Sequence, residues 1–92
     1  MGTPTTPMTM FIERPTFYNL MEEEITRAYS KHGTALWGRH EFYGILKEEV
    51  DELWDDIKAN KDPQTLLKEL VQVAAVCMRY YETGDRYRGT FI

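Results

Sequence analysis

Apolar residues recur at three- and four-residue intervals in three stretches of the chain, which is the period of an amphipathic α-helix. Glycines follow the first and third stretches, at Gly33 and Gly84, where helices commonly stop. Before the third stretch, Asp62 is a typical N-cap residue and Pro63 suits the first helical position. The predicted helices span residues 15–32, 39–60 and 63–83.

No segment shows the strict alternation of a β-strand, and no internal repeat is visible. The short "NKDPQ" turn makes the second and third helices an antiparallel pair. We therefore predict an all-α fold, an antiparallel helical hairpin with an additional N-terminal helix. A chain of 92 residues forms one small domain. It divides into a flexible arm rich in Thr and Pro (1–14), the helical domain (15–84) and a basic, aromatic tail (85–92).

The third predicted helix is apolar around almost its whole circumference. Two other helices are too few to cover such a helix in so small a protein. Part of its surface is therefore expected in a subunit interface, and we predict a homo-oligomer that assembles into a helix bundle.

The overall charge and the cysteine content narrow the function classes. The net charge is −4 and the sequence pI is about 5.1, which argues against binding to a nucleic acid polymer. The longest apolar run, Val73–Met78, is too short to span a membrane, and the N-terminal residues do not resemble a targeting segment. A single cysteine, Cys77, fits a reducing compartment, so a cytoplasmic protein is expected.

Acidic side chains fall on apolar helix faces in the stretch "KEEVDELWDDI" (47–57) and in the helix after it. On a helical wheel that starts at Phe42, Glu49 lies at about 340°, inside the apolar stripe, and Glu52 lies at about 280°, at its edge. On the third helix Glu69 is bracketed by apolar residues, with Gln72 one turn further on. The two facing helices thus each present a pair of oxygen-bearing side chains with i, i+3 spacing, and these pairs can converge.

Burial of an unpaired carboxylate costs several kcal/mol, so these side chains need partners. One possibility is a set of structural salt bridges, for which the nearby basic residues are Arg27, Lys47, Lys68 and Arg79. The other is a divalent cation, because clustered carboxylates suit hard ions such as Mg²⁺. Because two such acidic residues lie on facing helices, we favour the divalent cation over the salt bridges.

The motifs "EEVDEL" (48–53) and "KELVQVAAVCMRYYE" (68–82) resemble those of the MazG-like, all-α nucleoside triphosphate pyrophosphohydrolases, whose signature is E-E-x-x-E followed by E-x-x-D. The resemblance covers roughly residues 29–82, and it implies that the homo-oligomer is a dimer or a tetramer of helical hairpins. It implies that Glu49, Glu52 and Glu69 are catalytic and bind Mg²⁺, with Mn²⁺ as a substitute. Gln72 occupies the position of the usual Asp, where its carbonyl can still bind metal with one negative charge fewer.

The implied activity is Mg²⁺-dependent hydrolysis of an NTP or dNTP to the monophosphate and pyrophosphate. Because Gln72 departs from the motif, the alternative is a nucleotide-binding protein with weak or no turnover on the same fold. A purely structural helical module is a third interpretation. His32, His40 and Cys77 show no spacing typical of a zinc site or a nucleophile.

Five further residues are candidates for contact with the nucleotide. The aromatic side chains can stack on a base, although a core or interface position is the alternative for each of them. The basic side chains can bind phosphate, although simple exposure to solvent is the alternative for them. The candidates are Trp37, Trp54, Lys68, Arg79 and Tyr80.

Overall fold

The computed structural model describes residues 14–33 and 37–84, and in these ranges the chain forms three α-helices and no strand. The predicted all-α fold is confirmed. None of these helices is long and apolar enough to cross a membrane. The rest of the predicted N-terminal arm (1–13) and the C-terminal tail (85–92) lie outside the described residues. The helices are α2 (Arg14–His32), α3 (Arg39–Lys58) and α4 (Pro63–Thr83).

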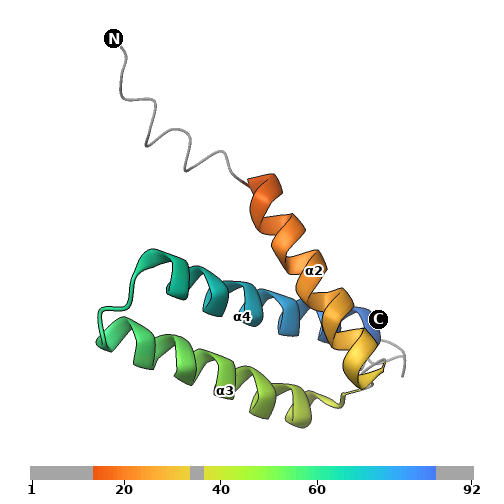
Figure 1. The fold of residues 1–92 in the computed structure, drawn as a ribbon. Coiled ribbons are helices and arrows are strands. Elements are labelled where there is room, and N and C mark those ends of the chain that lie inside the picture. The colour runs from red at the N-terminus through yellow and green to blue at the C-terminus, as the bar shows by residue number, and fades with distance from the viewer. Residues whose placement is uncertain (1–13, 34–36, 85–92) are drawn as a thin grey trace.

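α3 and α4 run antiparallel and side by side, and α2 crosses α4 obliquely (Figure 1). The two helices of the hairpin are held in register near their open end, where the rings of Phe42 and Tyr80 stack with centroids 4.1 Å apart. The arrangement leaves the N-terminal half of α2 diverging from the N-terminal half of α4.

α2 begins at Arg14, one residue before its predicted start. The larger difference lies at the turn between α3 and α4, where α3 ends earlier than predicted. α3 ends at Lys58 rather than at Asn60, because Asn60 adopts a left-handed backbone conformation with φ of 57°. The predicted cap of α4 is confirmed, since the Asp62 carboxylate accepts a hydrogen bond from the Thr65 N–H at 2.9 Å. Pro63 occupies the first turn, as predicted.

The apolar core lies almost entirely between α2 and α4. None of the 20 residues of α3 is buried. The hairpin therefore keeps much of its apolar surface accessible to solvent. The buried apolar residues are Ile25, Ala28, Val71, Ala75 and Val76.

Substitution of Gly84 by Ala tests the stacked end of the hairpin. Gly84 is buried, its N–H donates to the Tyr80 carbonyl at 2.8 Å, and a Cβ there would collide with the Tyr80 ring. Gly84→Ala should therefore displace the ring from Phe42 and destabilise the fold by about 1–3 kcal/mol in urea unfolding.

Gly44→Ala is the matched control, because a Cβ at Gly44, inside α3, meets no atom within 4 Å. This change should stabilise the protein by about 0.5–1 kcal/mol, since alanine favours a helix interior over glycine. Equal effects of the two substitutions would contradict the proposed role of the stack.

Candidate functional site

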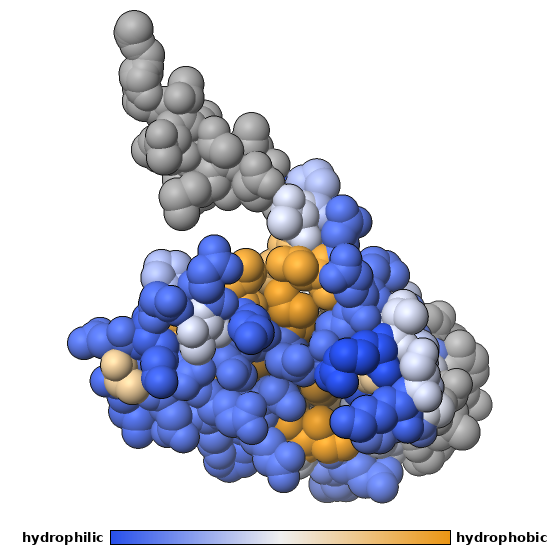
Figure 2. Space-filling model, viewed as in Figure 1, coloured by the Kyte–Doolittle hydropathy of each residue, from blue (hydrophilic) through white to orange (hydrophobic). Residues whose placement is uncertain are grey.

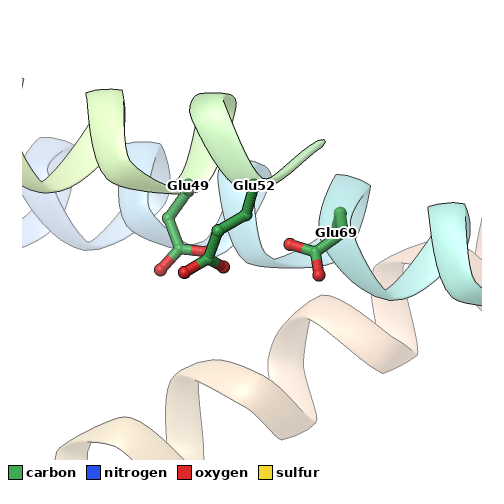
Figure 3. Close-up of side chains that lie close together, drawn as sticks. All are labelled: Glu49, Glu52 and Glu69. Atoms are coloured by element: carbon green, nitrogen blue, oxygen red, sulfur yellow. The ribbon is translucent and has the colours of Figure 1, made fainter. Parts of the chain in front are cut away.

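Three glutamates meet where α3 lies against α4. Glu49 and Glu52 project from α3 and Glu69 projects from α4 toward them, on the side of the hairpin that α2 covers (Figure 3). Each of the three offers a carboxylate oxygen, and these oxygens all lie within 4.8 Å of one another. We call Glu49, Glu52 and Glu69 the glutamate cluster. The part of the expected convergence that concerns Glu49, Glu52 and Glu69 is present in the structure.

Among the residues that the structure describes, no lysine or arginine forms an ion pair with the glutamate cluster. Two of the basic residues considered as salt-bridge partners form ion pairs with other acidic residues. Arg27 pairs with Glu24, and Lys47 pairs with Asp51 at 2.9 Å. One carboxylate oxygen of the cluster, Oε1 of Glu69, is buried without a hydrogen-bond partner. Within the described residues the cluster is thus a concentration of negative charge that no ion pair neutralises, although the nearby charge of Lys68 lowers the pKa of Glu69.

Two members of the cluster bind protons more tightly than an ordinary glutamate. Burial raises the pKa of Glu49, and the charges of Glu52, Glu69 and Glu24 raise it further. Burial also raises the pKa of Glu69, with a second contribution from Glu52. Glu24 belongs to α2, so all three helices contribute negative charge to the site.

Asp56 is a further acidic residue of the site that the sequence analysis overlooked. Its charge and its side-chain hydrogen bonding raise the pKa of Glu69. Asp56 is half-buried, whereas its neighbour Asp55 is exposed and pairs with Lys58 at 3.6 Å. Asp56 follows Glu49 by seven residues, so on the wheel it lies within about 20° of Glu49. This spacing is the signal that could have revealed it.

Gln72, predicted to complete the metal ligands, lines a cavity of about 560 Å³ between α2 and α4. Lys68, predicted to bind substrate, lines the same cavity, together with Glu24 and Arg27. The glutamate cluster is not part of this lining. The cavity nevertheless adjoins the cluster, because Glu24 lines the cavity and its charge acts on Glu49.

Three of the predicted substrate-binding residues lie at the other end of the hairpin. The Arg79 side chain is 9 % exposed, and its guanidinium lies 4.7 Å from the ring centroid of Trp37 and 5.6 Å from that of Tyr29. Tyr80 stacks on Phe42, as described above. These contacts hold α2, α4 and the residues before α3 together, and a role in substrate binding remains a prediction for all three.

Tyr29 connects this end of α2 to the last turn of α4. Its hydroxyl donates a hydrogen bond to Glu82 at 2.9 Å. Burial, with the bond to Glu82 as a second cause, raises the pKa of Tyr29 to about 12. The bond therefore persists across the physiological pH range, because Tyr29 keeps its proton there.

Trp54, the remaining aromatic candidate, is exposed on α3, with the Lys58 ammonium 5.4 Å from its ring centroid. It follows Glu49 by five residues, so it lies about 140° around the helix from that glutamate. Its ring is thus directed away from the glutamate cluster of its own chain.

No model of a protein family, no curated protein and no solved structure matches this chain. The resemblance to the MazG-like enzymes therefore remains a prediction from the two motifs.

The raised pKa values predict how stability depends on pH in a buffer with a chelator. Between the ordinary glutamate pKa of about 4.3 and the raised values, the folded state binds more protons than the unfolded state. Stability contributed by protonated Glu49 and Glu69 is thus lost as pH rises through this window. The double variant Glu49→Gln, Glu69→Gln should flatten the fall of melting temperature from pH 5 to pH 7.

Glu48→Gln is the control, because Glu48 is exposed on the same helix and its charge is the smallest of those that raise the pKa of Glu49. It should change the wild-type slope far less than the double variant does. A double variant with an unchanged slope would show that the cluster carries no electrostatic strain.

Asp56→Asn should lower the pKa of Glu69, since it removes a negative charge and a hydrogen-bonding carboxylate from beside it. Asp55→Asn removes the same charge one position away, on the exposed side, and should leave that pKa unchanged. Carbon-13 NMR titration of the side-chain carboxyl of Glu69 measures both. Equal shifts in the two variants would remove Asp56 from the site.

Proposed function

We propose that this protein is a Mg²⁺-dependent nucleoside triphosphate pyrophosphohydrolase, which converts an NTP or dNTP into the monophosphate and pyrophosphate. Mn²⁺ is the expected substitute for Mg²⁺. The proposal includes a homo-oligomer and a cytoplasmic location. The observation that carries it is the glutamate cluster, in which three carboxylates from two helices converge without a cationic partner among the described residues.

The donor set fits a hard divalent cation. Carboxylate oxygens are the ligands that Mg²⁺ prefers. One oxygen of each residue of the cluster lies within 4.8 Å of the other two, so the three flexible side chains could close around a single ion. A cation would also give the buried Oε1 of Glu69 the partner that it lacks. Glu49, Glu52 and Glu69 would therefore hold the ion.

A bound Mg²⁺ supplies charge neutralisation at the phosphate oxygens and a site at which water becomes more acidic. In the proposed reaction a water oxygen forms a bond to the α-phosphorus, and the bond from that phosphorus to the bridging oxygen breaks. Pyrophosphate leaves, and a carboxylate of the cluster accepts the proton of the water. Lys68, which lines the adjoining cavity, would contact the phosphates.

A second function is favoured by the position of Gln72. It brings no charge, and it lines the cavity between α2 and α4. With one carboxylate fewer than the motif that it resembles, the site would hold metal and nucleotide more weakly and turn the nucleotide over slowly. A nucleotide-binding protein on the same fold is thus the alternative.

Release of pyrophosphate from a panel of NTPs and dNTPs tests the enzyme. With Mg²⁺, the wild-type protein should release pyrophosphate, and Glu69→Gln should reduce the rate at least a hundredfold, because the variant loses a metal ligand and a charge. Glu48→Gln, with the same chemical change on the solvent side, should keep the wild-type rate.

The same panel separates the two functions. If no nucleotide is cleaved but one of them raises the melting temperature in a Mg²⁺-dependent manner, the protein binds nucleotide without turnover, as the alternative function states. If neither metal nor nucleotide changes the melting temperature, both proposals fail, and Glu69→Gln should then simply stabilise the fold.

A further inference from the structure

The cavity between α2 and α4 adjoins the glutamate cluster and is large enough for a small molecule. Its volume of about 560 Å³ lies within the range of small-molecule sites, about 300–1,000 Å³. Figure 2 shows apolar surface in the gap between these two helices, with hydrophilic residues on either side. The lining of the cavity is thus partly polar and partly apolar, and the order of the two parts is informative.

The helical period gives the order of the α4 residues that line the cavity. Gln72 lies about 60° and Lys68 about 100° from Glu69, in the same direction around the helix. Val71 and Leu67 follow in that direction at about 160° and 200°. The hydrogen-bonding side chains of the lining are therefore nearest to the glutamate cluster, and the apolar side chains are furthest from it.

The order of the chemical groups in a nucleotide matches this order of surfaces. In the proposed reaction the α-phosphate lies at the metal that the glutamate cluster would hold. The sugar is joined to that phosphate through a single oxygen, so it is the next group from the metal, and the base follows the sugar. The sugar would thus meet the polar part of the cavity. The faces of the base would meet the apolar part, at Leu67 and Val71.

Gln72 has the position and the chemistry to bind the sugar. It is half-buried and follows Glu69 by three residues, which is about 4.5 Å along the helix axis. Its amide offers both a donor and an acceptor, which suit hydroxyl groups. On the α2 side of the cavity, Glu24 pairs with Arg27 and keeps further acceptor capacity. Carboxylates commonly accept hydrogen bonds from ribose hydroxyls.

We propose that Gln72 binds the sugar rather than the metal, and that the substrate is a ribonucleoside triphosphate. This assignment rests on the proposed function and specifies its substrate. A polar pocket built for a hydroxyl discriminates against a deoxyribose, because its own polar groups then lose a partner. The metal does not need Gln72 for charge, since Asp56 of α3 already brings a fourth carboxylate beside Glu69.

The ratio of kcat/KM for each ribonucleotide to that for the matching deoxyribonucleotide tests the assignment. The wild-type protein should favour the ribonucleotide roughly tenfold, the effect of about one hydrogen bond. Gln72→Leu, which keeps a similar volume without the amide, should bring the ratio close to one. Its affinity for Mn²⁺, measured on the free protein by electron paramagnetic resonance, should equal that of the wild type.

Gln64→Leu is the matched control, because Gln64 lines the same cavity but lies about 12 Å from Gln72 along α4. It makes the same chemical change and should keep the wild-type ratio. The wild-type ratio is itself a test that needs no variant to fold. Equal use of the two sugars by the wild type, or a preference for deoxyribose, would overturn the assignment.

Two results for Gln72→Leu would also overturn it. One is an unchanged ratio between the two sugars. The other is a loss of Mn²⁺ affinity, which is the result expected if Gln72 binds the metal as the motif implies.

Failure of the sugar site and failure of the proposed enzyme give different results. Cleavage of both kinds of nucleotide at equal rates contradicts only the sugar site. If nothing is cleaved, calorimetry with Mg²⁺ measures the same ratio as dissociation constants for ATP and dATP. A preference for ATP that Gln72→Leu removes then supports the sugar site and contradicts only the enzyme, whereas the absence of any binding overturns both.

Discussion

The antiparallel pairing of α3 with α4 brings like charges together. Helical spacing directs Glu49 and Glu52 to one side of α3, and the register of the hairpin, fixed by the short turn and by the stack of Phe42 on Tyr80, places Glu69 beside them. Repulsion and burial both oppose this arrangement, and among the described residues no ion pair offsets it, although the charge of Lys68 acts on Glu69. The apolar contacts of the hairpin must therefore hold the carboxylates together.

The basic residues near the glutamate cluster make contacts elsewhere. Arg27 and Lys47 each pair with an acidic residue of their own helix, and Arg79 lies against two aromatic rings. The described part of the chain thus has cations near the site, yet the ion pairs that they form lie outside the cluster. An arrangement that served stability alone would place one of these cations between the glutamates, because a buried charge without a partner of opposite sign destabilises a fold.

Much of the fold follows from local chemistry that the sequence displays. The periodicity, the Asp62 cap and Pro63 locate α4 to the residue, and the cluster follows from the positions of Glu49 and Glu69 within apolar stripes. Features that depend on backbone conformation or on packing between helices were harder to predict. The left-handed conformation of Asn60 shortened α3, because asparagine tolerates a conformation that most residues avoid.

The positions of Arg79 and Gln72 illustrate the same limit. Each depends on how α2 crosses α4, and the angle between two helices is set by many side chains at once rather than by a period. Asp56 is different, since its spacing from Glu49 was visible in the sequence. It was missed because it stands in a run of acidic residues, most of which do face solvent.

The hairpin has a side with clustered negative charge and a side with exposed apolar side chains. Neighbouring residues contribute to the two sides. Glu49 and Glu69 belong to the charged side, and Val50 and Leu70, one position later, belong to the apolar side. In the proposed function, a cation would relieve the repulsion on the first side, and a partner subunit would remove the second side from water. Since the same two helices carry both, burial of Val50 and Leu70 would provide free energy that keeps the glutamates close, so that assembly and metal binding would favour each other.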